Sequence, residues 1–141
     1  WVSAIANEGT LYTPYIGDYF LNEAKEKESI QHEPIHTSVA SQNALRTVKE
    51  GMWSAVNGPR GTIKTLSGLK VKVAAKTGTA EFGKLNKDGV YENTHAWVTG
   101  FFPYEDPQYS FSVFLEDGGE SLNAVKVARK VIDWMVQSGL I

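Results

Sequence analysis

The chain has 141 residues, of which 42% are hydrophobic and 21% charged, with a formal net charge of −2 and no cysteine. This length supports one domain with a hydrophobic core of its own. The sequence contains no basic run interleaved with aromatic residues, which argues against nucleic acid as a partner, and no apolar stretch long enough to span a membrane. The lack of cysteine excludes disulfides and thiol chemistry within the chain.

The first forty residues predict little regular structure. Residues 1–8 are expected to form a helix that stops at Gly9. Residues 15–21 are consistent with a short strand. The charge run Glu-Ala-Lys-Glu-Lys-Glu within residues 22–29 predicts an exposed turn or loop.

A clear amphipathic helix is predicted over residues 41–56. Its apolar residues recur at three- and four-residue spacing: Leu45, Val48, Met52 and Val56. Ser41 is a suitable N-cap, and Asn57-Gly58 provides a stop signal.

The second half predicts an antiparallel sheet and a closing helix. A buried strand is expected within residues 63–75, followed by a polar connection over residues 82–93. Residues 95–102 and 109–115 read as two further strands joined by a short turn. Residues 121–138 carry one apolar stripe and predict a helix. The predicted class is therefore α+β, an antiparallel sheet covered by helices.

The most informative segment is Lys76-Thr77-Gly78-Thr79-Ala80-Glu81, which continues directly from the apolar residues 71–75. On an extended backbone, side chains alternate between two faces. Lys76, Gly78 and Ala80 then share one face, while Thr77, Thr79 and Glu81 share the other. A cation, two hydroxyl groups and a glycine that permits close approach suit an anion or a peptide ending in a carboxylate.

Lys-Thr-Gly is the third motif of penicillin-binding proteins and class A β-lactamases. The longer form Lys-Thr-Gly-Thr-Ala-Glu resembles the class B penicillin-binding proteins, the monofunctional peptidoglycan transpeptidases. The resemblance covers nearly the whole chain in register. Four further segments carry it: Glu50–Met52, Gly58–Thr62, His95–Trp97 and Gly100–Pro103.

The resemblance implies the partial fold of a penicillin-binding-protein or serine β-lactamase-like transpeptidase domain. In that family a serine attacks the bond between the last two D-alanines of a peptidoglycan stem peptide, and β-lactams trap the same serine. By this resemblance Lys76 would supply positive charge, and the hydroxyls of Thr77 and Thr79 would bind the substrate carboxylate. The Thr79 N–H would be an oxyanion-hole donor. Gly78 would allow the substrate to lie along the strand as an added strand, and Glu81 would border the groove.

The nucleophile that this chemistry needs is not recognisable in the chain. Ser67 and Lys70 match S-x-x-K in letters, but Gly68 and a predicted strand follow the serine, where the chemistry needs a helix N-terminus. The S-x-N matches at Ser41 and Ser121 fall at predicted helix starts, where serine and asparagine serve as caps.

The resemblance places the nucleophile, its lysine and the middle motif upstream. We therefore expect residues 1–141 to be the C-terminal portion of one transpeptidase domain, inactive alone. Its partners would be the stem peptide ending in D-Ala-D-Ala, β-lactams and the N-terminal part of the same protein. An extracytoplasmic location is expected, with a membrane anchor in that upstream part.

No metal or cofactor is expected. His32 and His36 have the i, i+4 spacing of zinc-binding helices, but Pro34 between them argues against a helix. His95, at the start of a strand, is expected to be a capped or partly buried histidine.

Three other functions stay open at this point. A serine β-lactamase or a β-lactam sensor of the same fold would also carry Lys-Thr-Gly. A non-catalytic domain that kept the peptide groove belongs to a different class. A P-loop is excluded, because Lys76-Thr77 lacks the preceding G-x-x-x-x-G.

Overall fold

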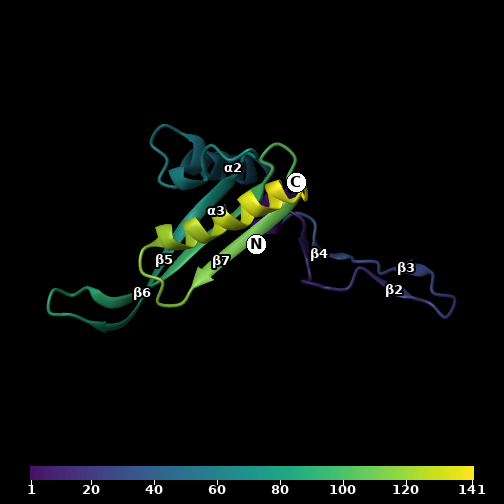
Figure 1. Cartoon of the computed structure of the whole chain (residues 1–141), viewed down its shortest axis with the longest axis horizontal. Coiled ribbons are helices and arrows are strands. Elements are labelled where there is room, and N and C mark those ends of the chain that lie inside the picture. The colour runs from purple at the N-terminus through teal and green to yellow at the C-terminus, as the bar shows by residue number, and fades with distance from the viewer.

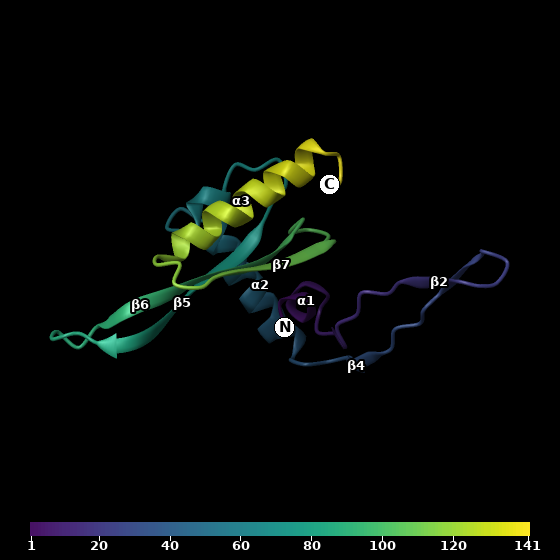
Figure 2. The same cartoon turned by 60° about the horizontal axis from the view of Figure 1, so that its bottom comes forward.

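A three-stranded antiparallel sheet forms the centre of the computed structural model, which describes residues 1–141. The strands β5 (Ala74–Leu85), β6 (Tyr91–Phe102) and β7 (Tyr109–Leu115) follow one another in space as in sequence. Helix α3 (Ser121–Gln137) lies along one face of this sheet, and helix α2 (Gln42–Asn57) and the short α1 (Val2–Ala6) lie on the other (Figures 1 and 2). The α+β class with a helix-covered antiparallel sheet is confirmed.

The two faces of the sheet bury two apolar clusters. Ala75 and Val98 pack with Val125 and Ile132 of α3. On the opposite face, Ala74 and Phe101 pack with Met52 of α2 and Ala6 of α1, and they complete a smaller cluster. The first two residues of β5 are therefore fixed from both sides, because neighbouring residues of a strand point to opposite faces.

Helix ends follow the predicted caps only in part. The Ser41 hydroxyl accepts the Ala44 N–H at 3.3 Å, and Gly58 is the C-cap of α2, so both signals are confirmed. The capping prediction for Ser121 is wrong, because Glu120 holds the N-cap position without a side-chain hydrogen bond. Asn123 instead donates to the Gly118 carbonyl at 2.8 Å and ties the helix to the turn before it.

The strand predicted within residues 63–75 is mostly wrong. Residues Lys64–Leu66 form a 3₁₀ helix, η1, and β5 begins only at Ala74. The last residue pair of the β5–β6 ladder is Ala74 with Phe101, so the residues before Ala74 lie outside the sheet. Their carbonyls are used elsewhere, since the Lys72 carbonyl accepts the Tyr104 N–H at 2.9 Å.

The polar connection predicted over residues 82–93 is also wrong. Strands β5 and β6 continue through most of it as a long hairpin, with an irregularity between Phe82 and Leu85. The turn is confined to the tip, where the Asn86 side-chain oxygen accepts the N–H groups of Asp88 and Val90. Polar composition reflected the exposure of this ribbon and not a lack of regular structure.

A further departure from the sequence prediction is a ribbon between α1 and α2. It contains β1 (Leu11–Tyr12) paired with β4 (Pro34–His36), and β2 (Tyr19–Leu21) paired with β3 (Lys27–Ser29). The expected strand over residues 15–21 shortens to β2, and in the expected turn or loop over residues 22–29 only the last three residues form a strand, β3. The ribbon projects far from the central sheet in both views (Figures 1 and 2).

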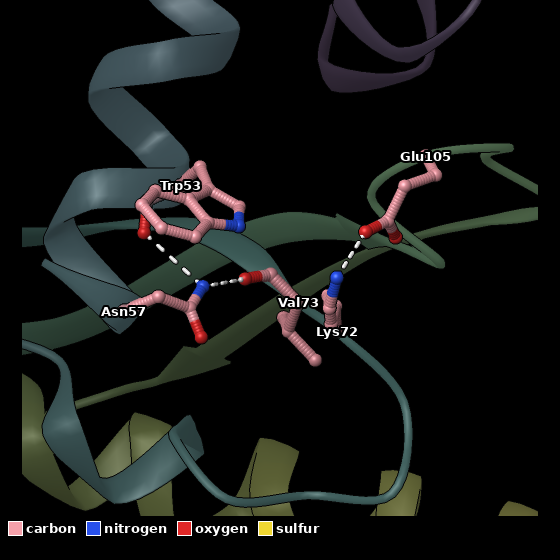
Figure 3. A network of polar contacts seen from close by, with 5 residues as sticks. All are labelled: Trp53, Asn57, Lys72, Val73 and Glu105. Carbon is pink, nitrogen blue, oxygen red and sulfur yellow. Dashed lines mark hydrogen bonds and ion pairs between the residues drawn. The ribbon is translucent and has the colours of Figure 1, made fainter.

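Two polar contacts fix the entry into β5 (Figure 3). The Asn57 amide, at the end of α2, donates to the Trp53 carbonyl at 3.2 Å and to the Val73 carbonyl at 3.0 Å. Lys72 forms an ion pair with Glu105 at 2.5 Å, and this hydrogen bond holds the pKa of the exposed Glu105 carboxyl below its usual value.

None of the helices is long and apolar enough to cross a membrane.

The Asn57 bridge predicts a measurable loss of stability on substitution. Asn57→Asp keeps the size of the side chain but replaces the donor by an acceptor that faces two carbonyls. We expect the free energy of unfolding in urea to fall by about 1–3 kcal/mol, because the buried Val73 carbonyl loses its donor. Gln137→Ala, at the exposed end of α3, is the control and should change it by less than about 0.5 kcal/mol. Equal values for both variants would contradict the bridge.

Candidate functional site

The segment Lys76–Glu81 lies on β5, the edge strand of the sheet. On its inner side β5 pairs with β6, with Lys76 opposite Thr99, Gly78 opposite Trp97 and Glu81 opposite Thr94. Its outer side has no strand partner. The backbone of the motif is therefore held straight on one side and open to an added strand on the other.

A hollow of about 830 Å³ opens beside this strand, between the sheet, α1 and α2. Lys76, Thr77 and Gly78 form one wall, and the rest is largely apolar. Residues from five other parts of the chain line it, among them Ile5 of α1, Met52 of α2, Thr62 of the following loop, Trp97 of β6 and Ser112 of β7. The sequence-predicted binding residues Lys76, Thr77 and Gly78 are thus brought to one surface, whereas Thr79 and Glu81 are exposed further along β5 and are not among its lining residues.

Lys76 brings an uncompensated positive charge to the hollow. Its exposed ammonium group donates to the Thr77 carbonyl at 2.6 Å. The ion pairs of the chain are Lys72 with Glu105 and Arg129 with Asp133, so no carboxylate neutralises Lys76. A free cation at the rim of an apolar hollow suits a ligand that ends in an anionic group.

Gly78 leaves space where any other residue would place a side chain. A Cβ atom built at this position would lie 3.4 Å from the Trp97 Cβ, on the face that Trp97 shares. A substituent there would fill the space between the strand and the indole. The close approach expected from the sequence is therefore available on the hollow side of β5.

An aromatic row that the sequence did not reveal supports the strand beyond the motif. The His95 ring stacks on Phe82 with centroids 4.0 Å apart and contacts the edge of Phe114 at 5.1 Å. Its Nδ1 atom accepts the Asp117 N–H at 3.0 Å, and Trp97 lies 4.4 Å from Phe114. His95 is partly buried, as expected. Alternation along β6 and β7 places these rings on one face, but their contacts depend on a register that the sequence alone did not specify.

The S-x-x-K match at Ser67 and the S-x-N match at Ser41 have structural roles. Ser67 ends the 3₁₀ helix, and its carbonyl accepts from Arg129, so it is not at a helix N-terminus. Neither Ser67 nor Lys70 lies in a helix or a strand, and the strand expected after the serine begins only at Ala74. A serine–lysine pair of the required geometry is absent here, and Ser41 acts as a cap.

The two histidines of the ribbon do not form the helical i, i+4 pair of a zinc-binding helix. His32 stacks on Tyr15 and contacts the Gly17 carbonyl through Nε2 at 3.0 Å, while His36 lies in β4. No group of three or more metal-ligating side chains exists anywhere in the chain.

Comparison with known proteins gives one consistent family. The penicillin binding protein transpeptidase domain model matches residues 1–133. The peptidoglycan D,D-transpeptidase MrdA of Haemophilus influenzae is 30% identical over 148 residues, which cover 96% of this chain and 22% of that protein. The chain thus spans about a fifth of this curated relative.

Solved structures agree in fold. The D,D-transpeptidase domain of a peptidoglycan glycosyltransferase from Eggerthella lenta matches 99% of this chain and 31% of its own, with a TM-score of 0.77 and 26% identity. Penicillin-binding protein A of Mycobacterium tuberculosis, solved as an imipenem acyl-enzyme complex, matches 94% of this chain and 28% of its own, with a TM-score of 0.74 and 24% identity. With the family model matching almost every residue, this chain belongs to the penicillin-binding protein transpeptidase family.

Proposed function

We propose that this chain supplies the substrate-binding wall of a peptidoglycan D,D-transpeptidase. The observation that carries the proposal is the open edge of β5, where the uncompensated charge of Lys76 meets the apolar hollow. A stem peptide ending in D-Ala-D-Ala is an extended chain with a terminal carboxylate. It matches an edge strand that carries a cation near its start.

Each motif residue has a part in this proposal. Lys76 attracts the substrate carboxylate, and the hydroxyls of Thr77 and Thr79 donate hydrogen bonds to it. The Thr79 N–H faces the reacting carbonyl as an oxyanion-hole donor, which in other enzymes lowers the barrier by about 3 kcal/mol. Gly78 leaves room for the substrate backbone, and Glu81 borders the groove further along β5.

The reaction needs a nucleophile from outside these residues. In the proposed first step a serine oxygen attacks the penultimate D-alanine carbonyl, and the terminal D-alanine leaves with the proton that the serine gave up. An amine of a second stem peptide then attacks the ester and releases the serine, which completes the cross-link. None of the serines lies at a helix N-terminus with a lysine one turn later, so we assign the nucleophile and its base to the N-terminal part of the same protein.

The family also suggests where the whole protein acts. Peptidoglycan lies outside the cytoplasmic membrane. We therefore propose an extracytoplasmic location, with the membrane anchor in the N-terminal part. β-Lactams would bind the complete site, as imipenem does in the Mycobacterium tuberculosis relative.

Labelling with a fluorescent penicillin tests whether the nucleophile lies in the N-terminal part of the protein. The 141-residue chain alone should remain unlabelled, whereas a protein that joins it to its N-terminal part should form a stable covalent adduct on that part. Labelling of the isolated chain would contradict the assignment. An adduct that hydrolyses within seconds would favour a β-lactamase, and the absence of any adduct on the complete protein would favour a non-catalytic peptide-binding domain.

The carboxylate-binding role of the hydroxyls predicts a graded kinetic effect in the complete protein. Thr77→Val should lower the second-order acylation rate about 10- to 100-fold, the effect of losing a hydrogen bond to a charged group. Thr65→Val, in the 3₁₀ helix away from the hollow, should leave that rate within about twofold. Equal acylation rates for wild type and Thr77→Val would contradict a role of this hydroxyl in binding the carboxylate.

A further inference from the structure

The ribbon between α1 and α2 is a preformed arm with no partner in the fold. Its base is tied to the body, since the Val39 N–H donates to the Gly9 carbonyl at 3.1 Å and the Gln42 amide to the Glu8 carbonyl at 2.9 Å. Beyond β1 and β4 it extends away from the sheet in both views (Figures 1 and 2).

The outer half of this arm is ordered by contacts of its own. His32 stacks on Tyr15 with ring centroids 3.3 Å apart, and the Lys27 ammonium lies 4.3 Å from the centre of the Tyr19 ring. Asn22 donates to the Glu28 carboxylate at 3.0 Å. A two-stranded hairpin is nevertheless only marginally stable in water, and a third strand would stabilise it.

The hydrogen bonds within the hairpin determine which residues direct their backbone N–H and C=O groups to the free edges. The Ile30 N–H donates to the Asp18 carbonyl at 2.9 Å, and the Asn22 N–H donates to the Glu26 carbonyl at 3.0 Å. Hydrogen-bonded and non-hydrogen-bonded residue pairs alternate along an antiparallel ladder. The pair Phe20 and Glu28, midway between these two, is therefore also hydrogen-bonded.

The intervening residues therefore direct their backbone groups to the free edges. On β2 these are Tyr19 and Leu21, and on β3 they are Lys27 and Ser29. Strand β3 contains two charged residues, Lys27 and Glu28, and charged side chains are a common protection against strand addition, although the Lys27 ammonium reaches across to the Tyr19 ring. The edge of β2 has no charge from Tyr19 to Leu21, so it is the edge open to another strand.

Apolar side chains surround this open edge. Ile16 is fully exposed, and Tyr19, Phe20 and Leu21 are each about half exposed, at 46%, 53% and 58%. Contiguous exposed apolar groups of this kind indicate an interaction surface.

Charge selects the kind of partner. Residues 15–36 contain five acidic and two basic residues, a net charge of −3, although the whole chain carries only −2. A second copy would bring two such arms together and repel. A basic partner is attracted instead.

We propose that the free edge of β2 binds an extended, positively charged segment of a partner protein, which adds to the hairpin as a third strand. Backbone hydrogen bonds to Tyr19 and Leu21 hold the segment, its apolar side chains cover Phe20 and Leu21, and its basic residues lie beside the acidic ones of the arm. This proposal is independent of the transpeptidase assignment, because it uses no residue of β5.

The test uses three labelled seven-residue peptides in which valine alternates with a variable residue, either lysine, glutamine or glutamate. Binding to the 141-residue chain is followed by fluorescence anisotropy at low and high salt. The lysine peptide should bind about tenfold more tightly than the glutamine peptide, with an advantage that salt removes, and the glutamate peptide should not bind.

Two proline variants provide a matched pair. Leu21→Pro removes an outward N–H from the β2 edge and should abolish binding, whereas Ser29→Pro removes one from the β3 edge and should leave it unchanged. Leu21→Lys is a second test that does not depend on proline. It keeps the N–H but adds a positive charge to the β2 edge, and it should weaken binding of the lysine peptide. Circular dichroism checks that each variant is folded.

Three results would overturn the proposal: no binding of the lysine peptide, equal binding of all three peptides, or equal losses in Leu21→Pro and Ser29→Pro. Concentration-dependent dimerisation in the ultracentrifuge that Leu21→Pro abolishes would assign the edge to a second copy instead.

Discussion

The site depends on the two different environments of a single strand. Ala74 and Ala75 at the start of β5 are fully buried, one against α2 and the other against the α3 layer. From the next residue, Lys76, the same strand runs beside the hollow with its outer side unpaired. The buried start gives the exposed part a defined position, so that the strand can present backbone groups without folding around a ligand. This is the preorganisation that binding an extended peptide requires.

Contacts at the entry to β5 add to this constraint. Asn57 and Lys72 fix the residues immediately before the strand, although they lie outside any strand themselves. Beyond the motif, the stacking of His95 on Phe82 holds β5 against β6 before the hairpin becomes irregular. The motif is therefore supported at both ends, by polar groups on one side and by aromatic rings on the other.

The sequence predicted the elements that bury an apolar stripe. Helix α2, helix α3 and strand β7 were recognised because their periodicity records a buried face. The long β5–β6 hairpin and the arm were missed, since both sides of these ribbons are polar or solvated and leave no periodic signal. The late start of β5 could not be predicted either. It depends on where β5 stops pairing with β6, which is a property of the sheet and not of local composition.

For the site, the residue types along β5 predicted the chemistry, and the structure added its surroundings. Lys76, Thr77 and Gly78 were expected to act together and do share one hollow. The contributions of Met52 and Trp97 to that hollow were not foreseen, because these residues look like ordinary core positions in the sequence. They become part of a binding surface only through the packing of α2 and β6 against β5.

The central claim is that β5 receives its ligand as an added strand. Hydrogen–deuterium exchange of the complete protein with and without a stem-peptide analogue ending in D-Ala-D-Ala tests it most directly. The account predicts slower exchange of backbone amides within residues 77–81 and no change in the arm over residues 15–36. Protection confined to other segments, with residues 77–81 unchanged at saturating peptide, would contradict it.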